Sequence, residues 1–364
     1  MKTLTAIYWL NSLSALAWSL IGVFIPIYLL TLGYPLKIIF VFYMLDSLVV
    51  FLSGAAAVFI SARIGLKKTL LLYLPFLAAF LVSLYFVNEF AGLIWLVAVF
   101  SAAQTAFYFM PINIIFARSA TAEKMGDSVG KMSAYPQIAS LAAPLIGGAV
   151  AFVGGFAALI ALSGAIFIVA AIWLFFIQDE QPKIEFGAAK ILQYFKNYSR
   201  YALVQICQFF QQTLESVIWP IFIYLTFGSI LSVGFAGALL GLGSFFFTLF
   251  VGKRADIQSK RTLFKIGAGA MLGVWIVRFF FHDEIIYYAI TVCAGFLGIL
   301  VAVPFNAMTF NISKRNNTAE FLLFREFTLL ISRLTAFGLA FFLADQLDYI
   351  FIAAAFSSLI FFLI

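Results

Sequence analysis

Residues 156–177 read FAALIALSGAIFIVAAIWLFFI, a stretch without a charged side chain. About 20 consecutive apolar residues are enough for a helix to cross the hydrocarbon core of a bilayer. The rest of the chain is similar, because 65% of its 364 residues are hydrophobic and only 10% are charged, against about 25% charged in an ordinary soluble domain. The composition therefore excludes a soluble enzyme, a nucleic-acid-binding protein, a secreted disulfide scaffold and a disordered chain. It predicts an all-α polytopic membrane protein.

Twelve transmembrane helices are predicted from the apolar runs and from the Gly, Pro and charged residues that separate them. Gly33-Tyr34-Pro35 and Gly154-Gly155 are two such breaks. The spans, numbered in chain order, are 6–32, 37–61, 69–88, 91–117, 129–153, 156–177, 200–227, 230–251, 262–281, 285–312, 319–344 and 349–364.

The basic residues lie almost entirely on one side of these spans. Eighteen of the 22 Lys and Arg residues lie on this side, in loops or at the ends of spans, and only Lys37 lies on the other. The eighteen are Lys2, Arg63, Lys67, Lys68, Arg118, Lys124, Lys131, Lys183, Lys190, Lys196, Arg200, Lys253, Arg254, Lys260, Arg261, Lys265, Lys314 and Arg315. Because cytoplasmic loops are rich in Lys and Arg, we expect both termini in the cytoplasm and the chain in the plasma (inner) membrane. This placement accounts for the net charge of +7 without a nucleic-acid partner.

The longest loop, 178–199, follows six predicted spans and precedes six. We therefore expect an N-terminal six-helix bundle over 1–177, a cytoplasmic linker over 178–199 and a C-terminal six-helix bundle over 200–364. Apolar residues in 186–196 recur at helical spacing beside basic ones, which predicts a short helix at the membrane interface.

A sequence repeat relates the two halves. Lys67-Lys68-Thr69-Leu70 follows span two, and Lys260-Arg261-Thr262-Leu263 follows span eight, 193 residues later. Pro111-Ile112-Asn113 in span four is matched by Pro304-Phe305-Asn306 in span ten, again 193 residues later. Two matches at one offset between corresponding spans indicate an internal repeat; the alternative is coincidence between common loop sequences.

The loop after span eight reads Gly252-Lys253-Arg254-Ala255-Asp256-Ile257-Gln258-Ser259-Lys260-Arg261. This loop resembles the signature loop of the major facilitator superfamily. It has a Gly, an Asp four residues later, and then a small residue followed by a basic pair. The loop after span two keeps Gly65 and a basic pair but has Ala62 where the family has Asp. With its two six-helix halves and central loop, the whole chain resembles this family.

The resemblance implies a rocker-switch transporter whose two bundles alternate access to a central cavity. Helices 1, 4, 7 and 10 would line the cavity, helices 2, 5, 8 and 11 would pack between the halves, and helices 3, 6, 9 and 12 would face lipid. The polarity of the spans agrees, because span seven is the most polar and spans six and twelve carry no charge.

Span seven supplies the main candidates for the substrate cavity. At 100° per residue, five of its side chains fall within about an 80° arc: Gln205, Gln208, Gln212, Glu215 and Trp219. Amides and a carboxylate are costly in a bilayer, so this stripe is expected to face a wet cavity. The alternative is a polar seam, with the Gln amides bonded to neighbouring helices. Gln104 and Tyr108 of span four and Asn306 of span ten complete the predicted cavity.

Charged residues in other spans are candidates for coupling and gating. Glu215 and Asp46 are the intramembrane acids best placed to carry protons, and a cationic solute would compete for the charge of Glu215. Asp46 is expected to pair with Arg333 as an outer latch, with Glu326 as the competing partner. Asp256 is expected to close the inner side near Ser128, and Arg325 and Glu326 to belong to an inner gate. Arg278 is interpreted as an interfacial arginine that reaches for the membrane surface.

The sequence offers no Ser-His-Asp candidate, no metal-ligand cluster and no phosphate-binding Gly-Lys-Ser/Thr loop. We therefore expect no enzyme, no cofactor and no metal, and a protein that draws on an ion gradient for uphill transport. Our leading prediction is a monomeric secondary active transporter that exports amphipathic compounds by proton coupling. Uptake of a polar nutrient such as a sugar is the runner-up, because Gln211-Gln212 resembles a pair in sugar porters. The third reading is a non-transporting membrane protein of the same fold, such as a scramblase or an assembly factor.

Overall fold

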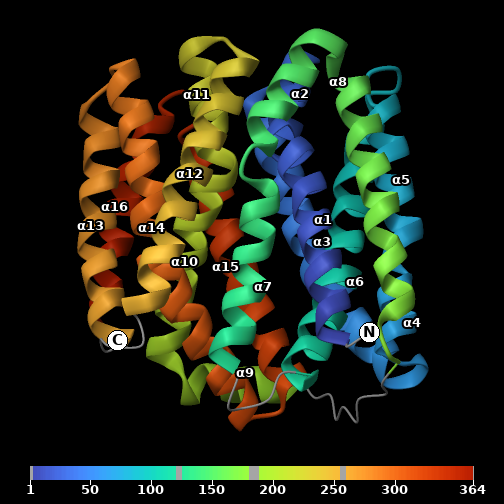
Figure 1. Cartoon of the computed structure of the whole chain (residues 1–364). Helices are drawn as coiled ribbons and strands as arrows, with labels where there is room; N and C mark the ends of the chain where they lie inside the picture. Colours follow the sequence, from blue (N-terminus) through green and yellow to red (C-terminus); the bar gives the residue numbers. More distant parts are fainter. Residues whose placement is uncertain (1–2, 120–124, 180–187, 255–259, 364) are drawn as a thin grey trace.

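The computed structural model of this protein describes residues 3–119, 125–179, 188–254 and 260–363. Within these ranges every regular element is a helix (Figure 1). Six helical runs are long and apolar enough, by length and composition, to cross a membrane: Thr3–Thr31, Leu36–Ile64, Leu66–Phe86, Leu93–Ser119, Ala134–Phe176 and Glu284–Ser313. The all-helical fold class predicted from the sequence is thus confirmed over the described residues.

The first half of the chain forms α1 to α8 with two short 3-10 turns. Their bounds are α1 Thr3–Ile21, η1 Gly22–Phe24, α2 Ile25–Thr31, α3 Leu36–Ile64, α4 Leu66–Leu71, α5 Tyr73–Phe86, α6 Leu93–Ser119, α7 Met125–Ser140, α8 Ala143–Ala171 and η2 Ile172–Phe176.

The second half continues with α9 to α16. Their bounds are α9 Ala188–Asn197, α10 Ser199–Thr213, η3 Leu214–Ile218, α11 Trp219–Phe227, α12 Ile230–Arg254, α13 Lys260–Phe280, α14 Glu284–Arg315, α15 Thr318–Phe342, η4 Leu347–Tyr349, α16 Ile350–Ile360 and η5 Phe361–Leu363. Spans one, three, five, six, seven and twelve are thus each built from more than one element.

The predicted Gly-marked breaks are where the backbone leaves helical geometry. Gly33 has φ +85° between α2 and α3, and Gly155 has φ 74° and ψ 173° inside α8. Positive φ is easily reached only by glycine. At Gly155 helix α8 bends sharply and its second part runs back along α5 (Figure 1), so this one element contains the end of span five and most of span six.

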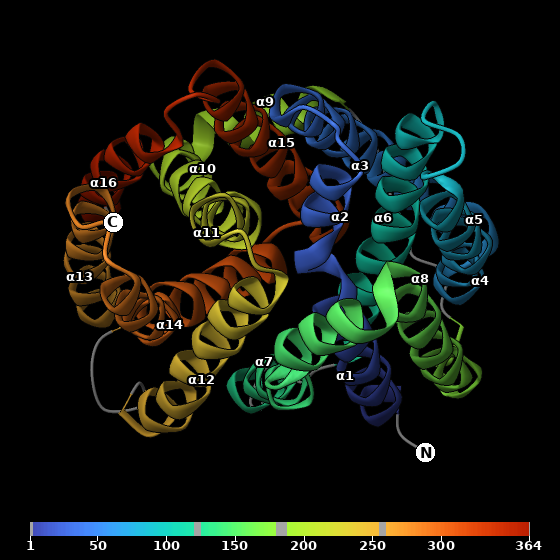
Figure 2. The same cartoon turned by 90° about the horizontal axis from the view of Figure 1, so that it is seen from above.

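The two halves of the chain lie side by side, seen from above in Figure 2. In the first half α1 packs on α7 and α8, and α6 packs on α3 and α5. In the second half α14 packs on α12 and α13, while α10 packs on α15 and α16. Contacts between the halves concentrate at two seams, α3 against α15 and α8 against α12. Span two meets span eleven in the first seam, and span five meets span eight in the second.

The α3–α15 seam is aromatic, whereas the α8–α12 seam is built from small residues. Tyr43 of α3 stacks on Phe337 of α15, with ring centroids 5.0 Å apart. In the second seam Gly148 lies against Gly234, where a Cβ built on Gly148 would sit 3.3 Å from the Gly234 Cα. Small residues at such crossings let two helix backbones approach closely.

The repeated motifs fall at corresponding elements of the two halves. Lys67 lies in α4, directly after α3, and Lys260 begins α13, after α12. Pro111 lies inside α6 and Pro304 inside α14. Helix α9 is in the predicted linker, and its Tyr194 and Phe195 pack on Phe324 of α15. The predicted contact of Asp256 falls outside the described residues.

Candidate functional site

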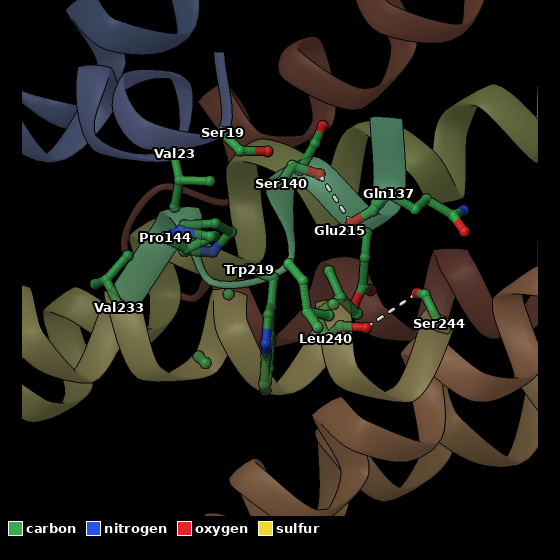
Figure 3. A pocket seen from close by; sticks show the side chains of 16 residues that line it. Ser19, Val23, Gln137, Ser140, Pro144, Glu215, Trp219, Val233, Leu240 and Ser244 are labelled. Atoms are coloured by element: carbon green, nitrogen blue, oxygen red, sulfur yellow. Dashed lines mark hydrogen bonds between the residues drawn. The ribbon is translucent and has the colours of Figure 1, made fainter. Parts of the chain in front are cut away.

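Three adjoining pockets surround the middle of the α10–η3–α11 segment, and together we call them the central cavity. The α7–α12 pocket has a volume of about 250 Å³ and includes Ser140, Pro144, Trp219 and Leu240 (Figure 3). The α10–α14 pocket is also about 250 Å³, and the α6–α15 pocket about 260 Å³. The first two share Glu215, so this carboxylate lies on their common wall.

The α10–α14 and α6–α15 pockets meet at three shared residues, Phe209, Gln212 and Arg325. The α6–α15 pocket lies between the halves, with Asn113 of α6 on one side and Arg333 of α15 on the other. The cavity thus combines apolar and aromatic walls with a small number of polar and charged groups. That composition is typical of sites for small organic molecules.

Glu215 is held by a bidentate ion pair with Arg278 of α13. Arg278 Nη2 lies 2.8 Å from Glu215 Oε1, and Nη1 lies 2.5 Å from Oε2. The arginine side chain is 0% exposed and the glutamate 17% exposed. Two parallel charge-assisted hydrogen bonds fix both the position and the orientation of the carboxylate.

Two tryptophan rings enclose the Arg278 guanidinium. Its central carbon lies 3.8 Å from the ring centroid of Trp219 and 4.8 Å from that of Trp275. Trp219 is itself fixed, because its Nε1 donates to Thr291 Oγ1 of α14 at 3.1 Å. Cation–π contact strengthens when both groups are removed from water. Arg278 is therefore an internal anchor and not the interfacial arginine expected from the sequence.

Glu215 lies in a π-helical turn, η3. The turn is followed by Pro220, the second residue of α11. Proline has no N–H for the carbonyl four residues earlier and its ring crowds that carbonyl, which here belongs to Ser216. A wider turn relieves this conflict, and π-turns are frequent at functional sites. The turn changes the angular spacing between Glu215 and Trp219 from that of a regular α-helix.

The model of the Major Facilitator Superfamily matches residues 7–200 of the sequence, more than half of the chain. The chain belongs to the major facilitator superfamily. It is therefore an integral membrane protein and a secondary transporter with a small-molecule substrate. No curated protein matches the sequence.

Solved structures share the superfamily fold over almost the whole chain. The human organic anion transporter MFSD10 (TETRAN) superposes with a TM-score of 0.73 at 13% identity, covering 99% of this chain and 98% of that one. A variant of the E. coli fucose:proton symporter FucP superposes with a TM-score of 0.71 at 12% identity, covering 99% of this chain and 96% of that one. At such identities the likeness concerns the fold alone.

The structure divides the predicted span-seven stripe of this transporter into two groups. Gln208, Gln212 and Glu215 line the α10–α14 pocket, and Gln208 Oε1 is buried without a hydrogen-bond partner among the described residues. Gln205 is instead buried in the helix packing, where its amide contacts Tyr201 at 3.1 Å and Thr328 at 2.8 Å. The polar-seam alternative thus describes Gln205, and the cavity reading describes the other two glutamines.

The other predicted cavity residues are also divided. Asn306 of α14 lines the α10–α14 pocket. Gln104 is buried and bonded within its own helix, to the Ser101 carbonyl oxygen at 3.0 Å. Tyr108 is buried as well, and its hydroxyl donates to Asn11 Oδ1 of α1 at 2.6 Å. Because these local partners satisfy both side chains, Gln104 and Tyr108 hold α6 in place instead of facing the cavity.

The predicted gating residues gather around α15. Arg333 and Glu326 line the α6–α15 pocket, and the charge of Arg333 acts on Asp46 of α3. Among the described residues, however, no ion-pair contact joins Asp46 to Arg333 or Arg333 to Glu326. Ser101 is the other polar side chain that acts on Asp46. In this conformation Asp46 and Arg333 therefore interact through their charges across the α3–α15 seam, without forming the ion pair of the predicted latch.

Two arginines of the site were not assigned to it from the sequence. Arg278 partners Glu215, and Arg325 lines two of the three pockets. The signal for Arg278 was available, because an arginine within a span needs a partner. The sequence pattern could not identify Glu215 as that partner, because it does not show that α13 lies beside η3.

Proposed function

We propose that this transporter moves amphipathic organic solutes outward across the plasma membrane, with both termini in the cytoplasm, and that a proton gradient drives it. The central cavity supplies the path, since its aromatic and apolar walls suit the body of such solutes and its amides suit their polar ends. The bundles over 1–177 and 200–364 would rock against each other along the α3–α15 and α8–α12 seams.

Glu215 is the proposed proton-binding group, and its ion pair with Arg278 is the observation that carries the proposal. The carboxylate is partly exposed on the wall of two pockets, while its partner is fully buried. A proton arriving from the cavity would neutralise Glu215 and release one end of the pair. The Arg278 charge would then remain without a counter-ion in a dry site, which is unfavourable. Protonation would therefore favour a different arrangement of α13 and η3, as coupling requires.

The sequence-based expectation that a cationic solute competes for Glu215 is modified by this pairing. Arg278 already occupies the carboxylate through both oxygens. A cationic solute would have to displace a buried guanidinium, whereas a proton needs only to reach the partly exposed carboxylate. The proposal therefore assigns Glu215 to the proton and assigns solute binding to other groups of the cavity.

The test is transport into proteoliposomes that hold an imposed pH gradient. Naphthalene-2-sulfonate and its neutral and cationic analogues serve as probes, and accumulation is compared for wild type and the double variant Glu215→Gln/Arg278→Gln. The double variant removes the proposed proton-binding group without leaving the arginine unpaired. We expect wild-type accumulation of at least one probe to follow the gradient, and the double variant to retain only equilibration. Gradient-driven accumulation by the double variant at the wild-type level would remove Glu215 from the coupling role.

A further inference from the structure

Arg325 is a charged group in the central cavity that no carboxylate among the described residues neutralises. It lies on α15 and lines both the α10–α14 and the α6–α15 pockets. Its guanidinium carbon is 5.6 Å from the centroid of the Phe209 ring. Within the described part of the chain its side chain makes neither an ion pair nor a hydrogen bond. Arginines at membrane depth normally face a partner or a water-filled cavity.

Arg278 is a second arginine beside the cavity, and its charge is neutralised inside the protein. That guanidinium is enclosed by two rings and held by both oxygens of one carboxylate. Arg325 has the ring contact but not the carboxylate. Its five N–H donors are fixed in a planar fork that matches a carboxylate or sulfonate. The Arg325 site thus differs from the Arg278 site in lacking a carboxylate partner among the described residues.

The other charges around the cavity do not supply this anion. Glu326 lines the α6–α15 pocket, but neighbouring residues on a helix do not face each other, and no ion pair of Glu326 is found among the described residues. The charge of Asp46 acts on Arg333, and Glu215 is held by Arg278. Arg325 and Arg333 therefore outnumber the one unpaired carboxylate, Glu326, on the pocket walls.

We propose that Arg325 binds the anionic group of the transported solute, and that the solute is an amphipathic monoanion with a carboxylate or sulfonate. This rests on the proposed transport function and names its substrate class. The planar guanidinium of Arg325 would hold the anion. Gln212 borders the same two pockets and would add amide donors. The Phe209 ring would contact the apolar body of the solute. Arg333, in the α6–α15 pocket, would make the local potential more positive and contribute less than Arg325 to binding of the anion.

The experiment compares three probes with one ring system and different charges: naphthalene-2-sulfonate, naphthalene-2-sulfonamide and 2-naphthyltrimethylammonium. The full chain is placed in phosphatidylcholine nanodiscs and binding is measured by calorimetry. Wild type should bind the sulfonate at least about tenfold more tightly than the other two, because charged hydrogen bonds are worth that factor or more. Arg325→Gln should remove this preference, Arg325→Lys should keep part of it, and Arg333→Gln should reduce it less.

Arg200→Gln is the matched control, since Arg200 is an exposed arginine at the start of α10, and it should leave the preference unchanged. Equal or tighter binding of the neutral or cationic probe by wild type would overturn the proposal. So would a sulfonate preference that survives in folded Arg325→Gln. If Arg325→Gln does not fold, Arg325→Lys decides, because an unchanged affinity there contradicts bidentate recognition. Sulfonate binding that depends on Arg325 without gradient-driven accumulation would contradict the transport function and leave this site standing.

Discussion

The Glu215–Arg278 pair sets the chemistry of the cavity wall at the scale of single residues. The arginine is completely enclosed and its carboxylate partner is partly open to two pockets. The buried arginine therefore depends on Glu215 for its counter-ion, whereas the carboxylate can also be hydrated from the cavity. Removal of one partner from such a pair costs about 3–5 kcal/mol, whereas removal of both can be nearly neutral.

Three charge-removing variants test the pair. Glu215→Gln should lower the free energy of unfolding by about 3 kcal/mol, because it leaves Arg278 buried without a counter-ion. Arg278→Gln should lower it less, since the remaining carboxylate can be hydrated from the cavity. The double variant should be more stable than Glu215→Gln by about 1 kcal/mol or more. Thermal unfolding in detergent measures the stability of each variant, and Glu89→Gln, at an exposed position, is the control. If the effects of the two single substitutions simply add in the double variant, the two side chains do not form a direct pair.

Helical spacing predicted the grouping of polar residues along span seven better than it predicted their partners. It predicts Gln208, Gln212 and Glu215 on one face, and in the structure all three line the α10–α14 pocket. Gln211, just outside the predicted arc, donates to Ser357 and Ser358 of α16 at 2.9 and 2.8 Å. Periodicity along one helix cannot identify such partners, because they depend on which helix packs on each face. The π-turn before Pro220 likewise follows from a local steric conflict that regular helical spacing ignores.

At the scale of elements, the contacts of α8 depend on glycines that let it approach α1 and α12. A Cβ built on Gly147 would lie 2.3 Å from the Leu20 carbonyl oxygen of α1, so the helices would have to separate. Gly147→Ala should therefore destabilise the protein by about 1–3 kcal/mol. Gly273→Ala is the matched control, because nothing lies within 4 Å of its added Cβ and alanine favours a helix by up to about 1 kcal/mol. Equal melting temperatures for the two variants would contradict this account of α8.

The start of α4 is capped from a distant part of the chain. Asp179, after η2, accepts a hydrogen bond from the Lys67 backbone N–H at 3.0 Å, and Lys67 Nζ donates to the Phe175 carbonyl oxygen at 3.1 Å. These contacts tie span three to the end of span six. A carboxylate here also stabilises the positive end of a helix.

Loss of this cap should be measurable. Asp179→Ala should lower the free energy of unfolding by about 1 kcal/mol, since it leaves the Lys67 backbone N–H without this acceptor. Asp345→Ala, an exposed acid in the loop after α15, should have no such effect. Thermal unfolding of both variants provides the comparison, and an Asp179→Ala melting temperature equal to that of Asp345→Ala would refute the cap.

The sequence predicted the elements well for a physical reason. In a bilayer every backbone group must be bonded within its own helix, so apolar runs and their breaks largely define the helices. Gly33 and Gly155 accordingly mark breaks in the structure. The internal division of span seven into α10, η3 and α11 was not predicted, because the apolar pattern continues through it. The burial of Gln104 and Tyr108 was missed because a polar side chain in a span can face another helix as readily as a cavity.

At the scale of the whole molecule, the central cavity lies among helices of both halves. Two seams hold the halves together, one aromatic and one built from small residues. Seams of this kind can slide or open while each bundle keeps its own core. We therefore expect the two halves to move as bodies around a fixed site near Glu215 and Arg325.

Two electron-spin distances test this motion most directly. Label pairs at Arg118 and Arg200 report the basic side of the molecule, and pairs at Glu89 and Asp345 report the opposite side, in a background with Cys207 and Cys293 replaced by Ala. Distances are measured in nanodiscs in acidic and alkaline buffer, with and without naphthalene-2-sulfonate. Alternating access predicts that one distance lengthens as the other shortens, and that Glu215→Gln/Arg278→Gln abolishes the response to pH. Distances that stay unchanged in all conditions, or that change together with the same sign, would contradict it.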